Sequence, residues 1–119
     1  MIKQIIYGLG LLASIYLNPA WSHAVVTHTT LKTESLVANQ AASIEINFNS
    51  KVEVKLSQIL LVRAGDIKEP VNAYPGDQPG IVKVDLPALP AGEYALQLRI
   101  FAADGHLSED LIRFFVPAE

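Results

Sequence analysis

The chain has 119 residues, a formal net charge of −3 and no cysteine. Its length suits one domain, and the lack of cysteine excludes disulfide bonds and thiolate metal sites. No basic patch interleaved with aromatic residues is present, and the acidic balance would repel phosphate, which argues against a nucleic-acid-binding protein.

The N-terminal residues have the pattern of a secretory signal peptide. A short basic start, residues 1–4, precedes the apolar run Ile5–Leu17, which is too short to cross a bilayer as a helix. Small residues follow at Ala20 and Ser22, three residues and one residue before His23. These are the positions that a signal peptidase recognises, so the pattern predicts cleavage before His23.

Cleavage at this position would change the composition of the chain. Loss of residues 1–22 as signal peptide removes Lys3, which leaves eight basic against twelve acidic residues and a net charge of −4. It also removes Met1, the sole methionine, so the mature domain, residues 23–119, would contain no sulfur. We expect this domain to be a secreted monomer without a stable membrane anchor, located in the periplasm, or outside the cell if the organism has one membrane.

The mature domain has the hydrophobic pattern of an all-β protein. Apolar and polar residues alternate over 42–48 and 94–100, as in strands with one buried face. Ile59–Val62 is a continuous apolar run that suits a strand covered on both faces. Strands are predicted at residues 23–30, 42–48, 59–62, 81–86, 94–100 and 111–116. This series, with a hairpin at its end, predicts an antiparallel immunoglobulin-like β-sandwich with Greek-key connections.

Turn residues indicate the connections between these strands. Residues 66–80 contain three of the prolines together with Gly76 and Gly80, and we expect them to form a long irregular loop. This loop has no histidine and no ligand spacing, so it is interpreted as a solvated crossover. Residues 89–94 resemble a tyrosine corner, in which the Tyr94 hydroxyl would bond to upstream backbone.

Three residues are candidate metal ligands. Cleavage would make His23 the first residue, and a free α-amine with its own imidazole can chelate one ion. Far downstream, Asp104-Gly105-His106 offers a carboxylate and a second imidazole on a turn where Gly105 suits a positive φ. Such nitrogen and oxygen donors suit copper(II), so we interpret these residues as a copper(II) site that joins the first strand to the last hairpin.

Each candidate has a structural alternative. Taken alone, His23 would be a solvent-exposed terminus and His106 an exposed turn histidine. Asp104 would then cap the turn rather than bind a metal. His28 lies five residues after His23, and alternation along a strand predicts that it faces the opposite side as a surface histidine.

With these residues in place, the chain resembles a known family, the CopC-like periplasmic copper-binding proteins. The matching segments are His23-Ala24, Ile44–Phe48, Leu89–Tyr94, Ala103–His106 and Phe114–Val116. The resemblance implies copper(II) as the bound ion and His23, Asp104 and His106 as its ligands. An inner-membrane copper transporter is the candidate partner.

The chain also departs from this family. It lacks the methionine-rich copper(I) segment of some members, and Ser50 stands where relatives often carry an acid. The prediction is therefore a copper(II) carrier or buffer that is not an enzyme. Two other functions stay open: a copper oxidase with a histidine brace, and a metal-free adhesion or assembly domain that would not depend on His23.

Overall fold

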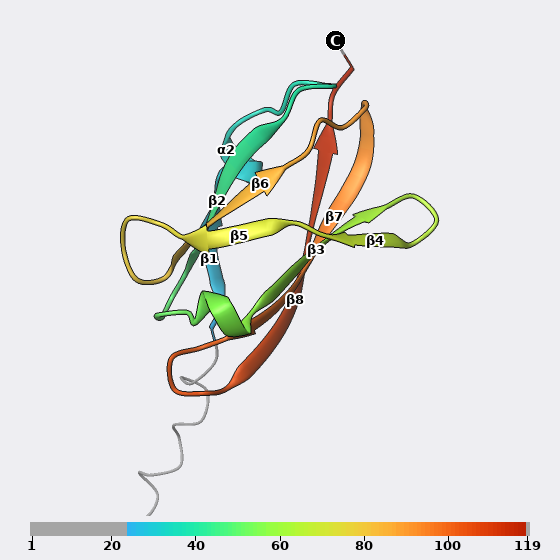
Figure 1. Ribbon diagram of the computed structural model, residues 1–119. Helices are drawn as coiled ribbons and strands as arrows, with labels where there is room; N and C mark the ends of the chain where they lie inside the picture. Colours follow the sequence, from blue (N-terminus) through green and yellow to red (C-terminus); the bar gives the residue numbers. More distant parts are fainter. Residues whose placement is uncertain (1–23, 119) are drawn as a thin grey trace, which may run out of the picture.

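Two four-stranded sheets build the part of the chain that the computed structural model describes, residues 24–118 (Figure 1). The first sheet has the order β1 (Val26–Thr29), β2 (Ala42–Phe48), β6 (Ile81–Leu86) and β5 (Asn72–Pro75). The second has the order β4 (Ile67–Pro70), β3 (Gln58–Arg63), β7 (Gly92–Phe101) and β8 (Leu107–Val116). Two short helices, α2 (Thr30–Thr33) and η2 (Val54–Leu56), lie in the connections. Neighbouring strands pair antiparallel, which confirms the predicted all-β sandwich.

Alternation along the strands decides which side chains enter the core. In β2, every second residue from Ile44 to Phe48 is buried, and in β8 the predicted face of Ile112, Phe114 and Val116 is buried. The inner faces of both sheets form one apolar core. Its largest fully buried side chains are Ile46, Leu61, Leu96, Leu98, Ile100, Val82, Val84 and Val116. Burial of each such side chain stabilises the fold by about 1.5–3 kcal/mol.

Crossovers between the sheets connect the two layers. β2 pairs with β6, and β3 pairs with β7, so neighbouring strands are often distant in sequence, as in Greek-key folds. The passage from β4 in one sheet to β5 in the other takes a single residue, Val71, and crosses the face of the sandwich in Figure 1. The Val71 N–H donates to the Ile59 carbonyl at 3.2 Å, which holds the crossing segment against β3.

The segment predicted as a long irregular loop, residues 66–80, contains two strands instead. β4 and β5 are both edge strands, and Pro70 and Pro75 end them. A proline is tolerated at such a position because an edge strand can lack an N–H without losing an internal ladder bond. The prediction was wrong because most residues of both strands are exposed, so they show no alternation of apolar and polar residues.

Two other predicted strands differ in detail. β1 ends at Thr29 because α2 begins at Thr30, and the predicted start at His23 lies outside the described residues. In β3, Ile59 and Leu61 are buried but the alternate residues are exposed or half-buried, so only one face lies in the core.

Within residues 24–118, no helix has the length and apolar character needed to cross a membrane.

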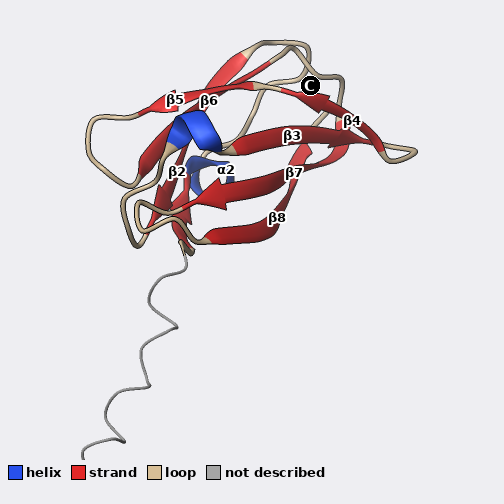
Figure 2. Cartoon of the chain, turned by 60° about the horizontal axis from the view of Figure 1, so that its bottom comes forward, coloured by secondary structure: helices blue, strands red, loops and turns tan. Residues whose placement is uncertain are grey.

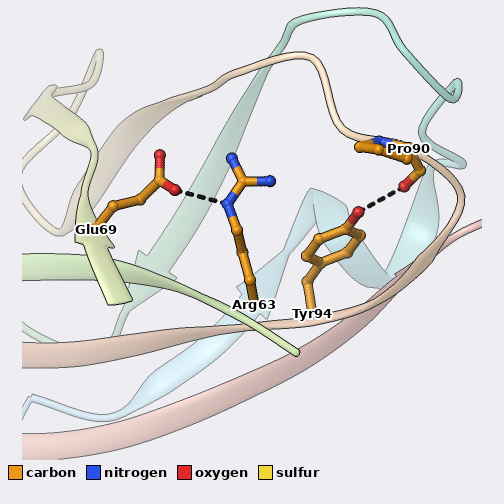
Figure 3. A network of polar contacts seen from close by, with 4 residues as sticks. All are labelled: Arg63, Glu69, Pro90 and Tyr94. Atoms are coloured by element: carbon orange, nitrogen blue, oxygen red, sulfur yellow. Dashed lines mark hydrogen bonds and ion pairs between the residues drawn. The ribbon is translucent and has the colours of Figure 1, made fainter. Parts of the chain in front are cut away.

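The predicted tyrosine corner is present. The Tyr94 hydroxyl donates to the Pro90 carbonyl at 2.6 Å (Figure 3). The Tyr94 ring stacks on Phe114, with the ring centroids 5.6 Å apart. Beside it, Arg63 Nε donates to Glu69 Oε1 at 2.6 Å and joins β3 to β4. This hydrogen bond holds the pKa of the Glu69 carboxyl below its ordinary value. Both partners are partly exposed, so solvent screens the pair and its contribution to stability is small.

We expect Tyr94→Phe to lower the free energy of unfolding by about 1 kcal/mol, because ring packing is kept and one hydrogen bond is lost. Tyr74→Phe is the matched control, since the Tyr74 hydroxyl also donates, to the exposed Asp85 carboxylate at 2.9 Å. The free energy of unfolding of Tyr74→Phe should fall by no more than about 0.5 kcal/mol. Urea unfolding measures both variants, and equal losses would contradict a special role for the corner.

Candidate metal centre

The turn between β7 and β8 carries the predicted D-G-H element. The Ala102 N–H donates to the His106 carbonyl at 2.9 Å, and the Gly105 N–H donates to the Ala102 carbonyl at 2.9 Å. Gly105 has a φ of 92°, and a Cβ placed there would meet no atom within 4 Å. Backbone conformation, not space, therefore favours glycine here, and the predicted positive φ is confirmed.

Asp104 and His106 lie in direct contact. Asp104 Oδ1 accepts the backbone N–H of His106 at 3.1 Å and lies 3.2 Å from His106 Nδ1. The backbone hydrogen bond is the largest cause that holds the pKa of Asp104 below its ordinary value, and the imidazole adds to it against an opposing effect of burial. Asp104 thus caps the turn and contacts the imidazole at the same time.

The described chain begins at the end of the sandwich where the β7–β8 turn lies (Figures 1 and 2). Ala24 is buried, and its N–H donates to Ser108 Oγ at 3.2 Å. The Val25 N–H donates to Asn49 Oδ1 at 2.8 Å, and the Asn49 N–H donates to the Val25 carbonyl at 3.0 Å. The residue that follows His23 in the sequence is therefore attached to β8 two positions after His106.

Residues 49–53 support two parts of this region: the β7–β8 turn and the first described residues of the chain. The Ala103 N–H donates to the Lys51 carbonyl at 3.0 Å, and Val52 forms an isolated bridge with Ala102. Ser50 Oγ is buried and has no hydrogen-bond partner in the described part of the chain. The segment after β2 thus contacts both the turn and the start of the described chain.

The structure brings two of the three predicted ligands together. Asp104 and His106 are neighbours on the turn, whereas His23 lies outside the described residues. Within residues 24–118, no three histidine, aspartate or glutamate side chains form a group suited to a metal ion.

His28 is exposed, as expected for a surface histidine. A bulge shifts the register of β1 between Val26 and His28, so strict alternation does not continue along this segment. That His28 faces away from His23 stays a prediction, because His23 lies outside the described residues.

The sequence did not indicate that Ser108 and Asn49 would hold the first described residues, Ala24 and Val25. Both lie near predicted elements, but a single serine at a strand start or an asparagine after a strand gives no signal for a partner. Their roles depend on contacts with residues far away in the chain, which local patterns do not report.

The fold and this turn define a β-sandwich with a carboxylate–imidazole pair at the tip of its last hairpin. The family model for the CopC domain matches residues 26–117, so the chain belongs to the CopC domain family. No curated protein sequence matches the chain.

Solved structures share this fold. CopC from Methylosinus trichosporium OB3b has a TM-score of 0.69 and 23% identity, covering 82% of this chain and 96% of that one. PcoC, a copper resistance protein from Escherichia coli, has a TM-score of 0.60 and 27% identity, covering 77% of this chain and 98% of that one. A second PcoC structure, of a protein described as methionine rich, has a TM-score of 0.59 and 27% identity, with 79% and 98% covered.

We expect an NMR titration to give Asp104 a pKa below the value of about 3.9 for an unperturbed aspartate. A lowered folded pKa means that the contact stabilises the fold above the unfolded pKa and stops doing so as pH falls through the folded value. In His106→Ala the backbone N–H remains, so the pKa should rise only part of the way. A full return to the ordinary value would show that the imidazole is the main cause.

Proposed function

We propose that the mature protein binds copper(II) and acts as a copper carrier or buffer in the periplasm. The ligands would be the α-amine and imidazole of His23, the imidazole of His106 and the carboxylate of Asp104. The observation that carries this proposal is the hydrogen bond from the Ala24 N–H to Ser108 Oγ at 3.2 Å. It attaches the residue after His23 beside the turn that holds the other two ligands.

The family and the donor chemistry support copper as the ion. The chain belongs to the CopC domain family, and its structural relative PcoC is a copper resistance protein. PcoC is also described as methionine rich, whereas this chain has one methionine, Met1, within the proposed signal peptide. Without sulfur ligands, the mature chain would bind copper(II) tightly and copper(I) weakly, because copper(I) prefers soft donors.

In the conformation described, the Asp104 carboxylate would orient the His106 imidazole, and direct binding to the ion would require the carboxylate to turn away from His106 Nδ1. The contact of its Oδ1 with His106 Nδ1 is the arrangement in which a carboxylate fixes the orientation and tautomer of a ligating imidazole. The nitrogen that binds copper would then be His106 Nε2. The structural relative PcoC is a copper resistance protein, so we propose binding rather than oxygen chemistry.

The proposed location follows from residues 1–22, whose removal as a signal peptide would place His23 first in a periplasmic domain of residues 23–119. An inner-membrane copper transporter is the partner that this role would require. We propose that the domain acts as a monomer. On edge strand β8, the Asp110 carboxylate accepts the Leu111 N–H at 2.8 Å, which hinders pairing with a strand from another chain.

The decisive experiment changes only the N-terminus. Copper(II) affinity is compared between protein that begins at His23, verified by intact mass, and the same protein with one alanine added before His23. The added residue converts the α-amine into an amide, so we expect a loss greater than the 10–100-fold that removal of a supporting residue typically costs. Equal binding by both proteins, or export of a protein that begins elsewhere, would overturn the proposed site.

A second experiment compares the two described histidines. His106→Ala removes a ligand, so it should weaken copper(II) binding more than Asp104→Asn, for which we expect a loss of about 10–100-fold. His28→Ala is the matched control and should bind as the unmodified protein does. A His28 variant as impaired as the His106 variant would contradict the ligand set.

Acid should release the metal from the folded protein. A free imidazole titrates near 6.5 and a free α-amine near 7.7–8, so protons compete with copper for these groups as pH falls. Affinity should therefore fall steadily from about pH 8 to pH 5 while circular dichroism shows an unchanged fold in the metal-free protein. Unfolding over the same range would show that pH acts on the sandwich itself.

A further inference from the structure

We propose that Ser108 and Asn49 are positioning residues that hold the mature N-terminus in place for copper before the metal arrives. This inference rests on the proposed function, because it concerns the same site. Ser108 and Asn49 would not bind the metal themselves. They would place His23, which would.

The contacts form a clamp around Ala24 and Val25. Ser108 Oγ accepts the Ala24 N–H at 3.2 Å, Asn49 Oδ1 accepts the Val25 N–H at 2.8 Å, and the Asn49 N–H donates to the Val25 carbonyl at 3.0 Å. The Ala24 side chain packs into the core with 6% of its surface exposed. The backbone amides of Ala24 and Val25 are thus held by two different side chains, Ser108 and Asn49.

The clamp joins both sheets at this point. Asn49 directly follows β2 in the first sheet, and Ser108 lies in β8 of the second. Consecutive Cα atoms are about 3.8 Å apart, so only the residue joined directly to Ala24 is kept close to Ser108 and the turn. A histidine one position further along a free terminus would lose this placement.

The physical effect is preorganisation. Ordering a free chain end on binding costs conformational entropy, which reduces affinity and speeds release. The clamp orders Ala24 and Val25 during folding, so metal binding has to order the terminal residue alone. Its loss should therefore weaken binding without changing the identity of the ligands.

The sharpest test inserts one glycine between His23 and Ala24. This variant keeps the amine, both imidazoles, Asp104 and the clamp, and changes only the distance from the clamp to the chelating residue. We expect copper(II) affinity to fall at least about tenfold. Binding equal to that of the unmodified protein would overturn the inference, because it would show that a loose terminus serves as well.

Side-chain variants test the clamp itself. Ser108→Ala should speed copper(II) dissociation by about tenfold and leave the electron paramagnetic resonance spectrum unchanged, since the ligands are the same. Ser108→Thr keeps the hydroxyl and should restore slow release. Ser57→Ala is the matched control: its hydroxyl also accepts a backbone N–H, from Phe101 at 3.0 Å, but holds no part of the terminus.

A metal-free measurement tests the clamp itself, and the copper dissociation rate separates this inference from the proposed function. Hydrogen exchange at the Ala24 amide should be slow in the unmodified protein and at least about tenfold faster in Ser108→Ala. If the unmodified protein binds no copper(II), the proposed function fails, and this inference fails with it even where Ala24 is protected. If copper binds but Ser108→Ala releases it at the original rate, the inference alone fails. If Ser108→Ala does not fold, copper(II) binding by the glycine insertion and by Asn49→Ala tests the same inference.

Discussion

The ten-pair ladder between β7 and β8 is the constraint on which both the core and the candidate site depend. It runs without a shift from Gly92 opposite Val116 to Phe101 opposite Leu107. Because the register is continuous, alternate side chains of both strands enter the core together, among them Leu96, Leu98, Ile100, Ile112, Phe114 and Val116. The same register closes at Ala102 and His106, so it also decides which residues stand at the tip. A slip of one residue would turn the core side chains of the slipped strand outward and move the D-G-H turn.

The tip combines a fixed backbone with accessible side chains. Its backbone is held by the hairpin bonds and by residues 49–53, while the side chains of His106 and Asp104 are 58% and 45% exposed. This combination suits the proposed role, because rigid support would set the geometry of the ligands and exposure would admit the exchange partner. The tyrosine corner lies near the other end of the hairpin, and the apolar core lies between the two sheets; both support the strands that carry the tip.

Sequence patterns predicted the parts of the fold in which burial alternates. β2 and β6 have the predicted bounds, 42–48 and 81–86, because their inward residues are apolar and, apart from Ile81, their outward residues are polar. β4 and β5 escaped prediction because exposed edge strands carry no such alternation. At the site, the turn and Gly105 were predictable from adjacent residues. The bond between Ala24 and Ser108 joins residues 84 positions apart, and no local pattern reports a contact at that separation.

The division of the proposed ligands between two ends of the chain links metal binding to both folding and export. His23 and His106 are far apart in an unfolded chain, so an ion held by both would bind the folded state and stabilise it. The His106 imidazole, one of the proposed ligands, is already in contact with the Asp104 carboxylate on the hairpin. The amine half would exist only after signal-peptide cleavage, since the precursor carries an amide at that nitrogen. Cleavage would therefore confine tight copper(II) binding to the compartment in which the protein is released.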